Sequence, residues 1–476
     1  MSRKFYPRYI KYVLKCSTIF VYGDKIVYAK TRKKKQLSDR ERRKTHAEDV
    51  YTDDIFNHAL QYIYTITDTF YVSRGIGSIA SGAIGIFAPL LILINGISST
   101  LGVGGGSVIS RKLGENDLTA GKKVVGCMIW IWLLCGVLIT TVGLLFLNPI
   151  LTLLGCTEEI YPYAVQYGKI MLLSTVISTG FSGIMRAEGD ILYSTLQWCC
   201  PVIINIVFDP VLIYHFHMGI SGAALATLIA QIFSMISSIY YFFFRKATPC
   251  RIKFKDISWD QQVCIQILSI GLPSFFNSLG NSFINMAGNH ILGAVGGTQA
   301  ISIYAVISRI QSFISTPFSG IMQGIQPMLG FDWGRKRPDR IKKTVYYAIF
   351  FSIVYGSICA LVLYFGSESI IGIFISETGV NHMAQNAMEI ICWSFVSGGI
   401  LLIVQAYFQA LGNGKKVLFL ALGSIFIVRL PLIFVGKVIG NITAIWWILV
   451  LSDWMIAAWA AGILYHGKMS SGQDAT

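Results

Sequence analysis

The segment SRKLGENDLTAGKKVV (residues 110–125) returns 220 residues later in altered form as GFDWGRKRPDRIKKTV (330–345). A second pair, AEGD (187–190) and ALGN (410–413), follows in the same order at an offset of 223. Such ordered self-similarity predicts a chain built from two related halves. The matched positions at offset 220 are Gly77 with Gly297, Ala80 with Ala300, Gly114 with Gly334, Lys122 with Lys342, Lys123 with Lys343, and Val125 with Val345.

Composition places both halves in a membrane. Hydrophobic residues make up 54% of the 476 residues and charged residues 13%, whereas soluble domains carry about 25% charged residues. The mean hydropathy is +0.60. The ten cysteines are scattered without a C-x-x-C pair, and we interpret them as packing residues. These values exclude a soluble enzyme, a disordered scaffold and a disulfide-stapled secreted domain, and they predict a polytopic membrane protein.

The apolar runs predict about 12 transmembrane helices, since a span needs about 20 apolar residues. Six helices per half is an even number, so both halves insert the same way up and are related by a pseudo-two-fold along the membrane normal. We therefore expect an all-α fold of two six-helix lobes. The candidate spans are a weak one at 55–72 and strong ones at 79–109, 124–148, 161–184, 192–214, 219–243, 263–293, 300–328, 344–366, 386–410, 416–436 and 441–465.

The polar stretches between these runs give the expected domain boundaries. A linker, FRKATPCRIKFKDISWDQQ, joins the two lobes. The expected parts are a basic cytoplasmic N-terminal segment at 1–54, an N-terminal lobe at 55–243, a cytoplasmic linker at 244–262, a C-terminal lobe at 263–465 and a tail at 466–476.

Basic residues are distributed unequally between alternate loops. One set of loops carries eighteen Lys and Arg, and the opposite set carries only Arg74 and Lys437. Cytoplasmic loops are enriched in Lys and Arg, so both termini are predicted to be cytoplasmic. The same distribution explains the net charge of +15 without nucleic-acid binding, because the basic residues lie in separate loops beside membrane spans.

Charged residues at membrane depth are costly and mark functional sites by default. Lys169, Arg309 and Glu389 can instead snorkel to an interface, and Arg429 can satisfy carbonyls that Pro431 leaves free. Asp453 is placed in mid-span, where a short side chain cannot snorkel. The seven charges inside predicted spans are Asp68, Lys169, Asp209, Arg309, Glu389, Arg429 and Asp453.

Asp209 has the most informative surroundings. Asn205 lies four residues earlier on the same helix face, and Pro210 leaves the carbonyl of Ile206 without its helical partner. These hard oxygen ligands suit a proton or a small alkali cation and not a transition metal. Asp68, in YIYTITDTFYV, is a second carboxylate at membrane depth. Two such carboxylates in one bundle would titrate as a pair, which can couple an ion to a conformational change.

Two tempting motifs carry weaker signals. GVGGGS (102–107) imitates a phosphate-binding loop, but it ends an apolar helix and is interpreted as a close helix-packing site. His215 and His217 fall in a short loop and are interpreted as interfacial.

Several motifs resemble those of the multidrug and toxic compound extrusion (MATE) family, in its DinF-like and MepA-like prokaryotic branch. The resemblance covers roughly residues 58 to 465, with motifs in order at repeat spacing. The matching stretches are ALQYIYTITDTFYVSRGIG (59–77), RAEGD (186–190), NIVFDPVLI (205–213), PFSGIMQGIQPMLGFDWGRKR (317–337) and QALGNGK (409–415).

The resemblance implies two six-helix lobes around a cavity that opens to one side at a time. It implies proton- or sodium-driven export of organic, often cationic or amphipathic compounds from the cell through the inner or plasma membrane. It also implies an ion site in the N-terminal lobe. The matching residues are Asp68, Asn205, Asp209, Thr227 and the carbonyl of Ala223.

The C-terminal lobe departs from the acidic site described for another branch of the family. Its first helix offers Asn277, Asn281, Asn285 and Asn289 and no carboxylate, which places C-lobe coupling in doubt. The polar residues expected to line a cavity are Asn281, Asn285, Glu389, Arg429 and Asp453.

The N-terminus also departs from the family pattern. Family members have an apolar, proline-containing run before the first-helix aspartate, whereas this chain has THAEDVYTDDIFNHALQYIY (45–64). The 44 preceding residues carry fifteen Lys and Arg. Two interpretations stand equally: an altered reading frame or start, or a short first helix with a basic arm. We expect residues 1–50 to stay outside the two-lobe core, because Lys and Arg each cost about 2.5–3.5 kcal/mol at a helix centre.

Other functions fit the sequence less well. A lipid-linked sugar flippase of the same superfamily would need several cations in its cavity for a pyrophosphate, and only Lys169, Arg309 and Arg429 are available. A membrane enzyme would need a catalytic cluster, which seven histidines do not form. A transport-deficient relict is the third alternative. We expect a monomer in the bilayer that binds small organic substrates, with no cofactor, no nucleic acid and no metal other than a coupling sodium ion.

Overall fold

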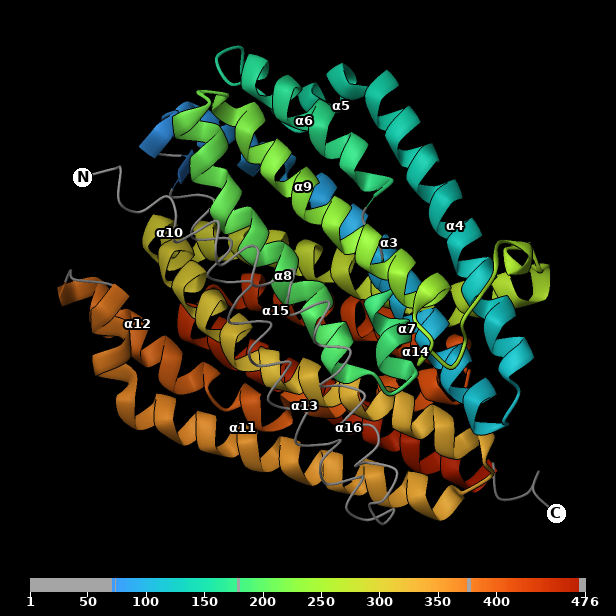
Figure 1. Cartoon of the computed structure of the whole chain (residues 1–476). Helices are drawn as coiled ribbons and strands as arrows, with labels where there is room; N and C mark the ends of the chain where they lie inside the picture. The colour runs from blue at the N-terminus through green and yellow to red at the C-terminus, as the bar shows by residue number, and fades with distance from the viewer. Residues whose placement is uncertain (1–70, 73, 178–179, 375–377, 471–476) are drawn as a thin grey trace. The chain divides into compact units, whose positions relative to one another are not determined.

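The computed structural model describes residues 71–72, 74–177, 180–374 and 378–470, and the regular elements in these ranges are all helical (Figure 1). The predicted weak span at 55–72 and the basic segment at 1–54 fall almost entirely outside the described residues. The chain divides into two compact units. One comprises residues up to Ile109 together with Asp117–Ile265, and the other comprises Ser110–Asn116 and the chain from Gln266 onward.

The first unit holds ten helical elements within the described residues. They are most of α3 (Ser78–Gly114), α4 (Leu118–Leu145), α5 (Leu147–Leu153), α6 (Tyr161–Thr175), α7 (Ser182–Ala187), α8 (Ile191–Pro210), the π-helix η1 (Val211–His215), α9 (Gly219–Ile239), the π-helix η2 (Tyr240–Phe244) and the short 3₁₀ helix η3 (Phe254–Asp256).

The second unit is organised around longer helices. They are most of α10 (Gln261–Gly334), α11 (Pro338–Phe374), α12 (Thr378–Ile391), α13 (Ser394–Ala410), α14 (Gly414–Leu422), the π-helix η4 (Gly423–Arg429), α15 (Leu430–Ile439) and α16 (Ile442–Ser470).

Within the described residues, eight helices are long and apolar enough to cross a membrane, and a bent pair formed by α12 and α13 gives a ninth. The 74-residue α10 is two helices that meet at Gly297, whose φ of 65° is not helical. This break agrees with the two spans predicted at 263–293 and 300–328. The span predicted at 161–184 differs, because α6 ends at Thr175 and a separate α7 begins at Ser182.

The backbone carries the internal repeat seen in the sequence. Residues with left-handed φ occur in pairs at offsets of 220 to 223, and each pair lies at an equivalent helix boundary. Asp190 and Asn413 follow two of these residues, and each accepts a hydrogen bond as an N-cap, from Tyr193 N and Lys416 N, both at 3.3 Å. The pairs are Gly77 with Gly297, Asn116 with Lys336, Gly189 with Gly412, and Gly219 with Gly440.

Glycines allow α3 to pack closely on α7 and on Gly180, which precedes α7. A Cβ at Gly102 would lie 3.0 Å from the Gly180 carbonyl oxygen, and one at Gly183 would lie 2.5 Å from the Gly102 carbonyl oxygen. Gly106 is equally close to the Gly183 carbonyl. The structure therefore confirms GVGGGS as a helix-packing motif.

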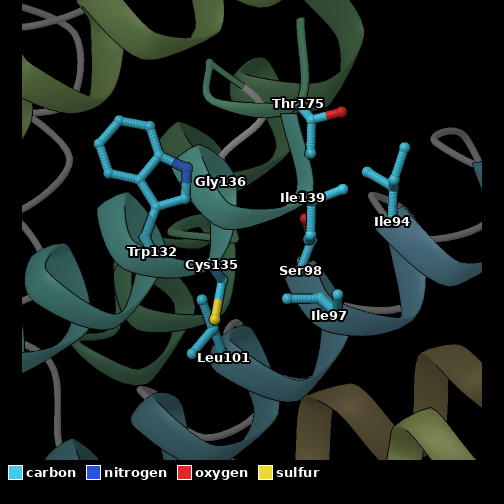
Figure 2. A pocket seen from close by; sticks show the side chains of 9 residues that line it. All are labelled: Ile94, Ile97, Ser98, Leu101, Trp132, Cys135, Gly136, Ile139 and Thr175. Atoms are coloured by element: carbon cyan, nitrogen blue, oxygen red, sulfur yellow. The ribbon is translucent and has the colours of Figure 1, made fainter. Parts of the chain in front are cut away.

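An apolar crevice lies in the first unit between α3, α4 and the end of α6 (Figure 2). No charged residue lines it, and the Thr175 hydroxyl already donates to the Met171 carbonyl oxygen at 3.2 Å. Its chemistry is that of a packing gap between helices and not of an ion site. The lining residues are Ile94, Ile97, Ser98, Leu101, Trp132, Cys135, Gly136, Ile139 and Thr175.

Candidate functional site

The structure brings three of the predicted ion-site residues together between α8 and α9. Asp209 is fully buried, Asn205 is 2% exposed, and Thr227 is half-buried. The side-chain amide of Asn205 is assigned the orientation in which its nitrogen faces a carboxylate and its oxygen faces a hydroxyl. In this orientation the nitrogen donates to Asp209 Oδ2 at 3.0 Å, and the oxygen accepts from Thr227 Oγ1 at 3.1 Å. The amide thus links the carboxyl group on α8 to the hydroxyl on α9.

Local backbone chemistry positions Asp209. Pro210 ends α8, and the next five residues form the π-helix η1. Pro210 has no N–H to donate, so the Ile206 carbonyl lacks its usual partner, and π-helical turns are common at functional sites. On the facing helix, Gly222 packs on the backbone of Leu212. The site therefore lies beside backbone that departs from a regular helix.

The two remaining residues predicted for the ion site are Ala223 and Asp68. Ala223 is 1% exposed and lies one turn before Thr227 on α9. Asp68 lies outside the described residues. Tyr71, three residues later, accepts a hydrogen bond at its carbonyl from the Tyr214 hydroxyl in η1 at 3.0 Å, so the chain just beyond Asp68 lies against the end of the α8–η1 segment.

The donor set in the first unit is hard and oxygen-rich. A carboxyl, an amide and a hydroxyl can bind a proton or an alkali cation, and they are poor ligands for transition metals. In the described part of the chain, no group of three or more His, Cys, Asp or Glu is arranged to hold a metal ion.

The residues that were predicted to line a cavity in the second unit contact different partners. Arg429 forms an ion pair with Asp453, so its partner is a carboxylate on α16 and not the carbonyl freed by Pro431. Glu389 accepts a hydrogen bond from Ser367 Oγ at 3.2 Å. The Tyr304 hydroxyl donates to Asn285 at 3.2 Å, whereas Asn281 is exposed on α10.

Two further charges predicted inside spans stay at the surface of their units. Lys169 on α6 and Arg309 on α10 are both exposed. Both positions are compatible with the snorkelling interpretation.

Sequence reasoning missed a polar cluster at the other end of α8. Asp190 pairs with the buried Arg245 beyond the end of α9, and the Tyr241 hydroxyl donates to Glu188 Oε2 at 2.8 Å. The guanidinium of Arg245 lies 5.0 Å from the ring centroid of Tyr193. The sequence does contain a pattern that could have indicated this cluster, because polar residues recur at helical spacing on both helices. The pattern is informative only once the two helices are known to pack together.

Comparison with known proteins gives the family. The MatE family model matches residues 55–211 and 273–435, which is more than half of the chain. The multidrug export protein MepA of Staphylococcus saprophyticus is 25% identical over 409 residues, covering 85% of this chain and 90% of that protein. MepA of Staphylococcus aureus strain N315 is 26% identical over 411 residues with the same coverage.

Solved structures agree in fold. A MOP superfamily transporter from Pyrococcus furiosus superposes with a TM-score of 0.82 at 23% identity, covering 89% of this chain and 95% of that one. An outward-facing multidrug resistance MATE family transporter gives 0.82 at 24% identity, with 90% and 96% coverage. The predicted all-α, two-lobe fold of about twelve helices is confirmed. The chain belongs to the MatE family of membrane transporters, in the branch that contains the MepA proteins.

Proposed function

We propose that this protein is an ion-coupled antiporter that exports organic, often cationic or amphipathic compounds through the plasma membrane by alternating access. The observation that carries the proposal is the buried carboxyl of Asp209, linked through Asn205 to Thr227 between two membrane-spanning helices. The names of the MepA relatives support multidrug export as the function.

Asp209 is placed to carry the coupling. A carboxyl with no exposure to solvent resists ionisation unless an ion or a proton accompanies it. Taking up and releasing that ion changes the charge of the interface between α8 and α9, and this change can bias a conformational equilibrium. Proton and sodium ion use the same oxygen ligands, and Asp68 is proposed as the second carboxylate of the site. Both termini are proposed to be cytoplasmic.

The second unit offers little support for a lipid-linked sugar flippase. Such a protein needs free cations for a pyrophosphate, but Arg429 is paired with Asp453. Lys169 and Arg309 are exposed on separate units. The relatives that the chain matches are named as multidrug export proteins, which favours transport over an enzymatic activity.

The test is ethidium efflux from cells that express the protein at matched levels. Asp209→Asn should abolish efflux, because an amide neither releases a proton nor binds a cation as a carboxylate does. Asp209→Glu should retain part of the activity, and Glu159→Gln, an exposed loop change, should leave efflux unchanged. Full efflux by Asp209→Asn would refute the proposal.

A further inference from the structure

Polar residues recur along the contact between α8 and α9, from the proposed ion site to the far end of both helices. Figure 1 shows the two helices side by side, and they are in contact along their length. We call this line of residues the α8–α9 seam. It runs from Asp209 on α8 and Thr227 on α9 at one end to Glu188, Asp190 and Arg245 at the other.

Hydrogen bonds connect the two sides of the seam at several positions. Beyond the Asn205–Thr227 pair, Gln197 Nε2 donates to Ser234 Oγ at 2.6 Å and to Ser238 Oγ at 2.7 Å. One turn further, Ser237 Oγ donates to the Tyr193 hydroxyl at 3.2 Å. The seam then ends in the Tyr241–Glu188 hydrogen bond and the Asp190–Arg245 ion pair.

Unsatisfied acceptors mark the middle of the seam, between the ion site and Gln197. The Oε1 atoms of Gln197 and Gln231 are buried and accept no hydrogen bond from the residues described. Pro201 lies inside α8 between Gln197 and Asn205, so the backbone carbonyl of Gln197 also lacks its helical partner. Buried acceptors of this kind are satisfied by water. These three acceptors are the positions at which the path proposed below would hold water.

Asp190 and Asp209 are nineteen residues apart on α8, which is about 28 Å at 1.5 Å per residue. By the loop charges, the Asp190 end faces the cytoplasm. We propose that the α8–α9 seam is a water-lined path by which the coupling proton leaves Asp209 for the cytoplasm, with Glu188 as the last carboxylate that accepts it. This inference rests on the proposed antiport with a proton as the coupling ion, and it identifies the route by which that proton is released.

The proton balance along this path is simple. Asp209 gives its proton to a water molecule, each water in the seam accepts one proton and donates another, and the Glu188 carboxylate accepts the last. Glu188 then releases a proton to the cytoplasm, so Asp209 ends ionised and one proton has crossed.

The surroundings of Glu188 suit a terminal acceptor. Burial raises its pKa to about 7, although hydrogen bonds from Tyr241 and Cys250 oppose the shift. The charged groups around it are Asp190, which adds to the increase, Arg245, which pairs with Asp190, and Lys122, which lies near Cys250. A carboxyl that titrates close to cytoplasmic pH can both accept and release a proton there.

The experiment uses the full chain in liposomes that contain a pH-sensitive dye on the side corresponding to the cytoplasm. Ethidium transport should drive proton movement in the native protein. Gln197→Leu and Gln231→Leu should abolish this movement while ethidium binding is retained. Gln166→Leu, the same substitution at an exposed position on α6, should behave as the native protein does.

A pH series tests the last carboxylate. Because ionised Glu188 is the acceptor, the native transport rate should rise as the cytoplasmic-side pH increases through about 7, and Glu188→Gln should lose this dependence. Native proton movement in both seam leucine variants, with Asp209→Asn inactive, would overturn the path and leave the antiport standing. Native activity in Asp209→Asn would overturn the antiport itself.

Discussion

Asn205 controls which oxygens of the candidate site remain available to an ion. Its amide nitrogen faces Asp209, and its carbonyl oxygen accepts from the hydroxyl of Thr227. In the proposed antiport, an ion that binds Asp209 would therefore compete with an amide donor, and its release would restore that hydrogen bond.

The Thr227 hydroxyl provides the first prediction at this scale. Thr227→Val keeps the shape of the side chain but leaves the Asn205 carbonyl without one donor, which costs about 1–3 kcal/mol for a buried group. We expect the ion concentration for half-maximal transport to shift by about fivefold or more, whereas Thr227→Ser should resemble the native protein. An unchanged ion dependence in Thr227→Val would contradict the role of this hydroxyl.

The Asp190–Arg245 pair gives a second prediction. Arg245 is 3% exposed, so removal of Asp190 leaves a buried charge without its carboxylate and should cost about 3–5 kcal/mol. Asp190→Leu should therefore lower the thermal unfolding midpoint of the purified protein strongly. The double variant Asp190→Leu/Arg245→Leu should be less destabilised than Asp190→Leu alone; a double variant that unfolds at a lower temperature would contradict the buried pairing.

The sequence predicts part of this site for clear reasons. Asn205 and Asp209 lie one helical turn apart, so their proximity follows from helix geometry, and Thr227 was identified by family resemblance. The contacts of Glu188 and Arg245 could not be predicted, because they depend on how α8 packs on α9. The pairing of Arg429 with Asp453 was not predicted for the same reason. Each charge was interpreted only from the residues of its own helix, whereas the pair joins two helices.

At the scale of elements, the contact of α3 with α7 depends on glycine. Gly183→Ala would place a Cβ 2.5 Å from the Gly102 carbonyl oxygen, and backbone on both sides limits relaxation. We expect a clear loss of folded protein, measured by size-exclusion chromatography in detergent. Gly85→Ala, on the same helix as Gly102 and with no neighbouring atom within 4 Å of the new Cβ, is the matched control and should fold as the native chain does.

Helix existence was easier to predict than helix interruption. Long apolar runs gave the spans, and the offset of the repeated motifs gave the equivalent boundaries later found at Gly189 and Gly412. The end of α6 at Thr175 was not predicted, because residues 161–184 form one predominantly apolar run. Hydropathy does not detect a helix end beside Gly180 and Gly183, which pack closely against α3.

At the scale of the whole molecule, the charge asymmetry of the loops predicts orientation. In a chain whose Cys156 is replaced by Ser, a cysteine at the exposed Lys123 should react with a membrane-impermeant reagent only after permeabilisation. A cysteine at the exposed Glu159 should react in intact cells. The opposite labelling pattern would invert the topology and place the Glu188 end of the seam outside the cell.

The central claim is that Asp209 couples an ion gradient to export. The most direct measurement is ethidium movement in liposomes that contain only the purified protein, driven by an imposed proton gradient or, separately, by a sodium gradient. The native protein should transport ethidium with at least one of these gradients, and Asp209→Asn should transport with neither. Gradient-driven transport by Asp209→Asn at the native rate would contradict the account.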